Sequence, residues 1–147
     1  MTSSLSKVSR VRPEFRNINA LRDLPTYRLP AAGWVSILHR VSGALLFILL
    51  PFIIWMFDTS VSSEYSFARF IALFKIGALG LPGFFYKLVA LALIWAFLHH
   101  LVAGVRHLIM DAAHAVSKEF GKTSAIVTLA LSLSLTLLLG AKVFNFY

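Results

Sequence analysis

Leu88-Val-Ala-Leu-Ala-Leu-Ile-Trp-Ala-Phe-Leu-His99-His100-Leu-Val-Ala-Gly104-Val105 contains no Asp, Glu, Lys or Arg, and Arg106 follows it directly. A run of this length is close to the roughly 20 apolar residues that a helix needs to cross the hydrocarbon core of a bilayer. Two similar uncharged runs, 41–57 and 123–141, lie before and after it. The three runs predict three transmembrane helices.

The composition of the whole chain supports this prediction. Of its 147 residues, 59% are hydrophobic and 14% are charged, and the mean hydropathy is +0.80. A soluble domain carries about 25% charged residues. We therefore expect an all-α integral membrane protein. The expected spans are about 31–57, 86–110 and 123–142, within a membrane domain of residues 31–147.

The segments between the spans contain their own signals. Pro51 lies inside the first apolar run and predicts a kink there, which membrane helices tolerate better than soluble helices do. Residues 58–87 form the first loop, in which 67–79 is expected to be a short interfacial helix and Leu81-Pro82-Gly83 a turn. Residues 106–122 are expected to connect the second and third spans.

The formal net charge of +8 is concentrated ahead of the membrane, because seven of the fourteen basic residues precede residue 41. Basic residues beside a span keep that side in the cytoplasm and attract anionic lipid. Residues 1–30 are therefore expected to form a basic, cytoplasmic N-terminal segment. A nucleic-acid-binding role is not expected, because the remaining chain is mostly lipid-soluble. The expected location is the bacterial inner membrane, with the mitochondrial inner membrane as the less favoured alternative.

The chain has no cysteine, which excludes disulfides and cysteine-ligated iron–sulfur clusters within it. Any metal must therefore be held by imidazole or oxygen ligands. Ionisable groups inside a span are costly and usually functional, so histidines in the apolar runs are of particular interest. The five histidines are His39, His99, His100, His107 and His114.

Helical spacing gathers polar residues on two faces. On the second span the group is His100, Gly104, His107 and Asp111, and on the first it is Ser36, His39, Arg40 and Gly43. Residues at such intervals share one side of a helix. Because three spans alternate in direction, the start of the first and the end of the second lie on one side of the membrane. The two faces are therefore expected to converge, with His100 about 9 Å deeper than Arg106.

The residues around His100 on the second span suit a haem. A histidine in hydrocarbon with no adjacent acid is a good neutral metal ligand, and haem iron in a helix bundle takes axial imidazoles. His100 is the candidate ligand, beside a glycine that leaves room for a flat cofactor. The anionic haem propionates need cations at the membrane edge. The candidates for that role are His39, Arg40, Arg106 and His107.

A quinone headgroup needs hydrogen-bond donors and a proton source near water, and Ser36, Arg40 and Asp111 are suitable in type and depth. Structural roles remain open for the same residues. Ser36 could serve helix packing, Arg40 and Arg106 could be anchors that snorkel, and Asp111 could pair with Arg106 or His107. An intramembrane histidine can also simply hydrogen-bond a neighbouring helix, which is the favoured interpretation for His99.

Two sequence segments carry a resemblance to a known family. They are Ser36-Ile-Leu-His39-Arg40-Val-Ser42-Gly43 and His100-x-x-x-Gly104-Val-Arg106-His107-x-x-Met110-Asp111. Both closely resemble the signature segments of the succinate dehydrogenase cytochrome b subunits. The resemblance extends to three spans, to overall length and to Arg12-Pro13 near the N-terminus. The second segment is the more specific of the two.

By this resemblance the three spans form part of a heteromeric helix bundle, and His100 is the axial ligand of haem b. The second ligand would come from a smaller membrane anchor subunit. Ser36 and Arg40 match ubiquinone-site positions, and His39 lies beside the haem propionates. Arg106, His107 and Asp111 match positions near the same edge.

The resemblance implies a membrane-anchoring, haem b- and ubiquinone-binding subunit of succinate dehydrogenase. It would pass electrons from the iron–sulfur subunit, which receives them from the flavoprotein subunit, to quinone in the tricarboxylic acid cycle and respiratory chain. The chain alone would not be an enzyme. Two alternatives stay open: the anchor of a fumarate reductase, and a cofactor-free structural or proton-conducting membrane subunit.

Overall fold

The computed structural model describes residues 19–23, 26–115 and 117–144. Most of the expected basic N-terminal segment, including Arg12-Pro13, lies outside the described residues. The elements follow in the order α1 (Ala20–Asp23), α2 (Ala31–Ile48), α3 (Leu50–Val61), α4 (Glu64–Lys75), β1 (Gly77–Ala78), β2 (Leu81–Pro82), α5 (Gly83–Ala112) and α6 (Lys118–Val143). Among the described residues, α2, α5 and α6 are long and apolar enough to cross a membrane. The expected all-α membrane fold with three spans is confirmed.

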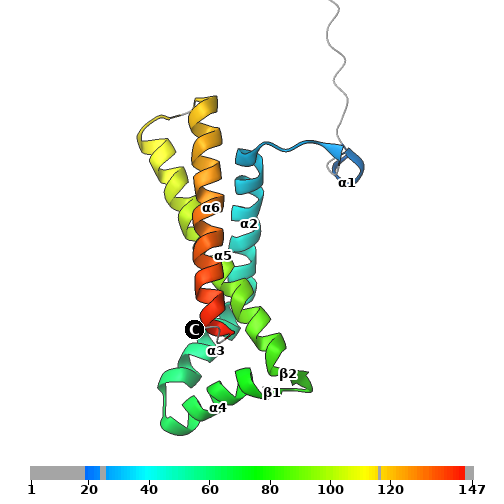
Figure 1. The fold of residues 1–147 in the computed structure, drawn as a ribbon, viewed down its shortest axis with the longest axis vertical. Helices are drawn as coiled ribbons and strands as arrows, with labels where there is room; N and C mark the ends of the chain where they lie inside the picture. Colours follow the sequence, from blue (N-terminus) through cyan, green and yellow to red (C-terminus); the bar gives the residue numbers. More distant parts are fainter. Residues whose placement is uncertain (1–18, 24–25, 116, 145–147) are drawn as a thin grey trace, which may run out of the picture.

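The three long helices run side by side, and α5 is antiparallel to both others (Figure 1). The start of α2, the end of α5 and the start of α6 therefore lie at one end of the bundle. Helices α3 and α4 and the β1–β2 hairpin lie at the other end. The helices approach through small residues such as Ala96, Ala103 and Ala125, which are completely buried. Small residues allow close contact between membrane helices, where apolar burial alone gives little driving force.

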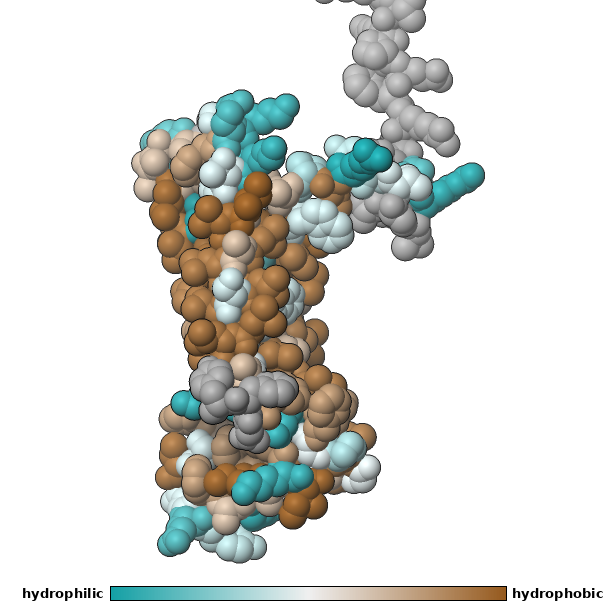
Figure 2. Space-filling model, viewed as in Figure 1, coloured by the Kyte–Doolittle hydropathy of each residue, from teal (hydrophilic) through white to brown (hydrophobic). Residues whose placement is uncertain are grey.

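The surface has the distribution of polarity that a membrane requires. Figure 2 shows a band of hydrophobic side chains around the middle of the bundle, with hydrophilic side chains gathered where α6 begins and scattered over the α3–α4 end. Large apolar side chains such as Phe97, Leu133 and Leu137 are more than half exposed on this band. Lipid is the solvent in which such a surface is stable.

The first span differs from its prediction. The sequence predicts one kinked helix over 31–57, but α2 ends at Ile48 and a separate helix, α3, begins at Leu50. Pro51 explains the break, because it has no N–H to donate and its ring clashes with the carbonyl four residues earlier. It lies instead in the first turn of α3, where proline is well tolerated.

The second and third spans are longer than expected. Helix α5 covers Gly83–Ala112, so the residues after Arg106 that were expected to begin the connection are helical. The connection starts where His114 adopts a left-handed backbone conformation, with φ of 48°. Helix α6 then begins at Lys118, because the Ser117 hydroxyl accepts a hydrogen bond from the backbone N–H of Phe120 (3.2 Å) and so caps the helix.

The short helix expected at 67–79 lies a few residues earlier, as α4. Ser63 fixes its start, because its hydroxyl and that of Ser66 cap each other's backbone N–H groups. The reversal expected at residues 81–83 is made instead by Leu79 and Gly80, which both have positive φ. Residues 81 and 82 form β2, which pairs antiparallel with β1.

Candidate functional site

Three histidines pack ring against ring at the interface between α2 and α5. The rings of His39 and His100 lie parallel, with centroids 4.2 Å apart and an interplanar angle of 19°. The centroid of the His107 ring lies 5.3 Å from that of His39, with the two rings tilted by 45°. This histidine column, His107–His39–His100, joins the two polar faces identified in the sequence.

The His100 ring is held by one of its two nitrogens. Nδ1 lies 3.1 Å from the backbone oxygen of His39 and 3.3 Å from Oγ of Ser42. A carbonyl oxygen can only accept, so Nδ1 carries the proton and donates it. Nε2 then bears the lone pair, and no hydrogen bond from the described residues engages it. A metal-ligating histidine commonly has its other ring nitrogen fixed by a backbone carbonyl in this way.

A glycine of α2, Gly43, provides the space for the His100 ring. A Cβ on Gly43 would lie 2.8 Å from Cε1 of His100, which is too close, whereas a Cβ on Gly104 would lie 3.7 Å from Nε2 of His39, an ordinary contact. Ser42, which is completely buried, and Gly43 therefore belong to the site. The sequence motif contained both residues, but spacing alone did not reveal that they touch His100.

His99 faces the opposite neighbour, α6. Its side chain is completely buried, its Nδ1 lies 3.1 Å from Oγ of Ser132, and Trp95 stacks on its ring at 5.6 Å. Its Nε2 is buried without a hydrogen bond to the described residues, although the backbone of Val35 interacts with the ring. His99 is therefore enclosed within the three-helix bundle.

Ser36 and Arg40 form a pair one turn apart on α2. Arg40 donates from Nη2 to Oγ of Ser36 (3.1 Å) and from Nε to the backbone oxygen of Ser36 (3.3 Å). Arg40 is exposed and Ser36 is half-buried. The guanidinium and the hydroxyl thus present several hydrogen-bonding groups together, beside the histidine column.

Asp111 and His107 share an open hollow of about 550 Å³ at the end of α5, which His114 also lines. Both Asp111 and His107 are exposed. Asp111 forms no ion pair with the described residues, so the pairing with Arg106 considered from the sequence is absent. The carboxylate is free to interact with solvent or with a ligand.

Arg106 does not join this site. Its side chain is buried and donates from Nε to Oγ of Ser124 (2.9 Å) and from Nη2 to the backbone oxygen of Gly121 (3.1 Å), both on α6. The sequence prediction grouped Arg106 with His107 at one edge. Successive residues of a helix project about 100° apart, so Arg106 faces α6 while His107 faces α2.

This arrangement defines a class of protein: a small α-helical membrane protein with an imidazole-lined site between its first two spans. The chain belongs to the succinate dehydrogenase/fumarate reductase transmembrane subunit family, which it matches over residues 16–139. The resemblance found in the two sequence segments is thereby confirmed for most of the chain.

Named relatives support this assignment. The chain is 31% identical over 118 residues to the succinate dehydrogenase cytochrome b556 subunit of Coxiella burnetii, covering 80% of this chain and 90% of that one. It is 32% identical over 117 residues to the cytochrome b556 subunit of Paracoccus denitrificans (78% and 83% covered). It is 28% identical over 115 residues to the cytochrome b560 subunit of Reclinomonas americana (78% of each chain).

Proposed function

We propose that this chain is the haem b- and ubiquinone-binding membrane anchor of a succinate dehydrogenase, and that it passes electrons from the iron–sulfur subunit to quinone. One observation carries the proposal: the Nδ1–H of His100 is tied to the His39 carbonyl, which leaves Nε2 as a lone-pair donor at a half-buried position. The names of the relatives, all cytochrome b subunits, support the same conclusion.

The residues present fit a haem shared between two chains. Within the described residues no group of three or more His, Cys, Asp or Glu side chains could hold a metal ion, but a haem asks for only one axial imidazole from this chain. His100 would be that ligand, and a smaller anchor subunit would supply the second. His39, His107 and Arg40 would neutralise the propionates. When bound, the haem supplies one-electron redox chemistry.

Ser36, Arg40 and Asp111 would bind the quinone. The Ser36–Arg40 pair offers N–H and O–H donors to a quinone oxygen, and charge-assisted donors of this kind are strong. Asp111 stands in an open hollow and could deliver protons from the aqueous side. These residues have distinct tasks: α2 orients the headgroup, and the end of α5 moves protons.

The proposal places the chain in a complex in the bacterial inner membrane. Its partners would be the smaller anchor subunit, the iron–sulfur subunit and, through the latter, the flavoprotein subunit. The basic N-terminal side, where α2 begins, would face the cytoplasm. The histidine column opens toward that side, where a soluble electron donor could approach it.

The test is the reduced-minus-oxidised optical spectrum of the complex purified through this chain, compared between the wild type and His100→Leu. We expect a b-type band that the substitution removes or shifts. An unchanged band would reject His100 as the ligand. A complex that is colourless even when haem is supplied would favour the cofactor-free structural alternative.

The quinone site has a separate test. Ser36→Ala and Arg40→Leu should impair quinone reduction several-fold more than dye-linked succinate oxidation, because the dye takes electrons before they reach the membrane. Equal losses in both assays would place the quinone elsewhere. The family description also includes fumarate reductases. Measuring the haem potential and identifying the quinone that supports turnover would distinguish a succinate dehydrogenase from a fumarate reductase.

A further inference from the structure

Arg106 is a buried cation without a counter-charge among the residues that the structure describes. Its side chain is only 7% exposed, and it forms no ion pair with any described residue. The acidic residues that flank it in the sequence, Asp111 and Glu119, are both exposed. Burying a charge without a partner is costly in protein or lipid. The position therefore calls for an anion that the described residues do not supply.

The guanidinium also has hydrogen-bonding capacity left over. It carries five N–H groups, of which one donates to Ser124 and one to Gly121. Three N–H groups therefore remain without a partner among the described residues. The two bonds to α6 fix the orientation of the Arg106 guanidinium. An anion that binds the remaining N–H groups therefore meets a preorganised site.

A separate cavity of about 330 Å³ lies against Arg106 between α5 and α6. None of the three histidines in the histidine column lines it. Apart from Arg106 and three hydroxyl side chains, its walls are apolar. The lining residues are Val102, Arg106, Ile109, Phe120, Thr123, Ser124, Val127 and Thr128.

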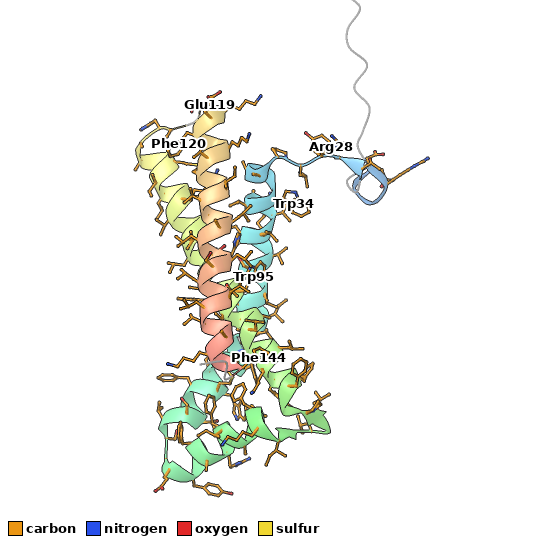
Figure 3. The ribbon with its side chains drawn as sticks, viewed as in Figure 1. Arg28, Trp34, Trp95, Glu119, Phe120 and Phe144 are labelled. Atoms are coloured by element: carbon orange, nitrogen blue, oxygen red, sulfur yellow. The ribbon has the colours of Figure 1, made fainter. Side chains whose placement is uncertain are left out.

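The position of this Arg106 pocket restricts what can fill it. Phe120 lies at the end of the bundle where α6 begins (Figure 3), so the pocket lies near the membrane surface. Val127 and Ile109 are more than half exposed, so the pocket opens sideways toward lipid.

We propose that the Arg106 pocket binds an anionic phospholipid of the bilayer. The phosphate would accept hydrogen bonds from the free N–H groups of Arg106, and an acyl chain would lie along Val102, Ile109 and Val127. An anion that also has apolar chains matches both halves of the pocket, the buried cation and the apolar walls. This site is independent of the haem and quinone sites proposed above, because it uses the other face of α5.

The test uses the whole complex after extended detergent exchange. Dioleoylphosphatidylglycerol or dioleoylphosphatidylcholine is added back, and the lipid retained per complex is measured by native mass spectrometry. We expect the wild type to retain the anionic lipid about tenfold better, since charge-assisted hydrogen bonds are worth about this factor. Inorganic phosphate should not displace it.

Three variants isolate the pocket. Arg106→Met removes the charge and should abolish the preference for anionic lipid. Val127→Trp should fill the pocket from its exposed side and lower lipid retention while Arg106 is intact, so the test survives if the first variant does not fold. Lys122→Met removes an exposed cation at the same end of α6 and should leave retention unchanged.

Several results would overturn the proposal. Equal retention of the two lipids by the wild type would exclude charge recognition. Loss of the anionic lipid in Lys122→Met as large as in Arg106→Met would indicate a diffuse surface effect. Displacement by inorganic phosphate would indicate a plain anion site. Release of another membrane subunit by Val127→Trp, with lipid retention unchanged, would indicate that a partner helix fills the pocket.

Discussion

His99 and His100 are neighbours on α5, yet they serve different interfaces. His99 faces α6, where it is completely buried and meets a serine hydroxyl. His100 faces α2, where it is half-buried and held by a backbone carbonyl and by another imidazole ring. A rotation of about 100° between successive helical positions is sufficient to separate the two roles.

The two interfaces differ in how their polar groups are satisfied. On α6, the buried hydroxyls of Thr128 and Thr136 donate to backbone oxygens one turn earlier, so these two hydroxyls are satisfied within their own helix. The α2–α5 interface instead ends in exposed polar side chains, including His107 and Arg40. The α2–α5 interface therefore leaves polar groups accessible at the edge of the bundle, where a ligand can reach them.

The most severe test of this comparison replaces each of the two histidines by leucine in turn. We predict that His99→Leu retains the haem band of the purified complex, whereas His100→Leu loses most of it, because the His99 ring is completely buried within the bundle and the His100 ring is only half-buried. Ser132 stays satisfied in His99→Leu through its own bond to the Leu129 carbonyl (3.3 Å). Optical spectra of both variants decide the matter, and loss of the band in His99→Leu alone would reverse the assignment.

A smaller but still large effect is expected from Gly43→Ala. The added methyl group would lie 2.8 Å from Cε1 of His100, so the ring must move away from its carbonyl partner. We predict a several-fold loss of haem content or a shifted band. Gly121→Ala is the matched control, because a Cβ there meets nothing within 4 Å. If both variants kept a normal spectrum, the close fit of His100 against α2 would be irrelevant to haem binding.

A substitution at the α5–α6 interface should change the stability of the complex and not its haem spectrum. Ser132→Ala removes the hydroxyl that meets Nδ1 of His99, and interhelical hydrogen bonds in membranes contribute about 0.6–1.7 kcal/mol. We predict a thermal midpoint of the complex lowered by a few degrees, with the haem spectrum unchanged. Ser134→Ala, at an exposed position on the same helix, should have no effect. A spectral change in Ser132→Ala would show that the two interfaces are coupled.

The smallest effect is expected from Ser42→Ala. Nδ1 of His100 keeps its bond to the His39 carbonyl (3.1 Å) when the longer contact to Ser42 (3.3 Å) is removed. We therefore predict normal haem content and a stability change below about 1 kcal/mol. A loss of haem comparable to that of Gly43→Ala would mean that Ser42, and not the carbonyl, orients the ring.

The sequence predicted the three spans and the common end of the two polar faces, because charge-free runs and helical spacing are local properties. It could not show that Arg106 turns toward α6, because the neighbour that a side chain meets depends on how helices pack. The contacts of Ser42 and Gly43 with His100 were missed for the same reason. Serine and glycine are common wherever membrane helices pack closely, so their presence alone does not identify a functional site. Pro51 was recognised, but its effect, a helix end instead of a kink, depends on the surrounding packing.

The unequal lengths of the spans have a consequence for the surrounding bilayer. At 1.5 Å per residue, α2 extends about 27 Å and α5 about 45 Å, against a hydrocarbon thickness of about 30 Å. Tilting alone would need an angle beyond the usual range of about 40°, so part of α5 must project into the headgroup layer. If its last turns project, His107 and Asp111 reach hydrated headgroups while His100 stays in hydrocarbon. Proton supply and electron acceptance would then be separated by depth along a single helix.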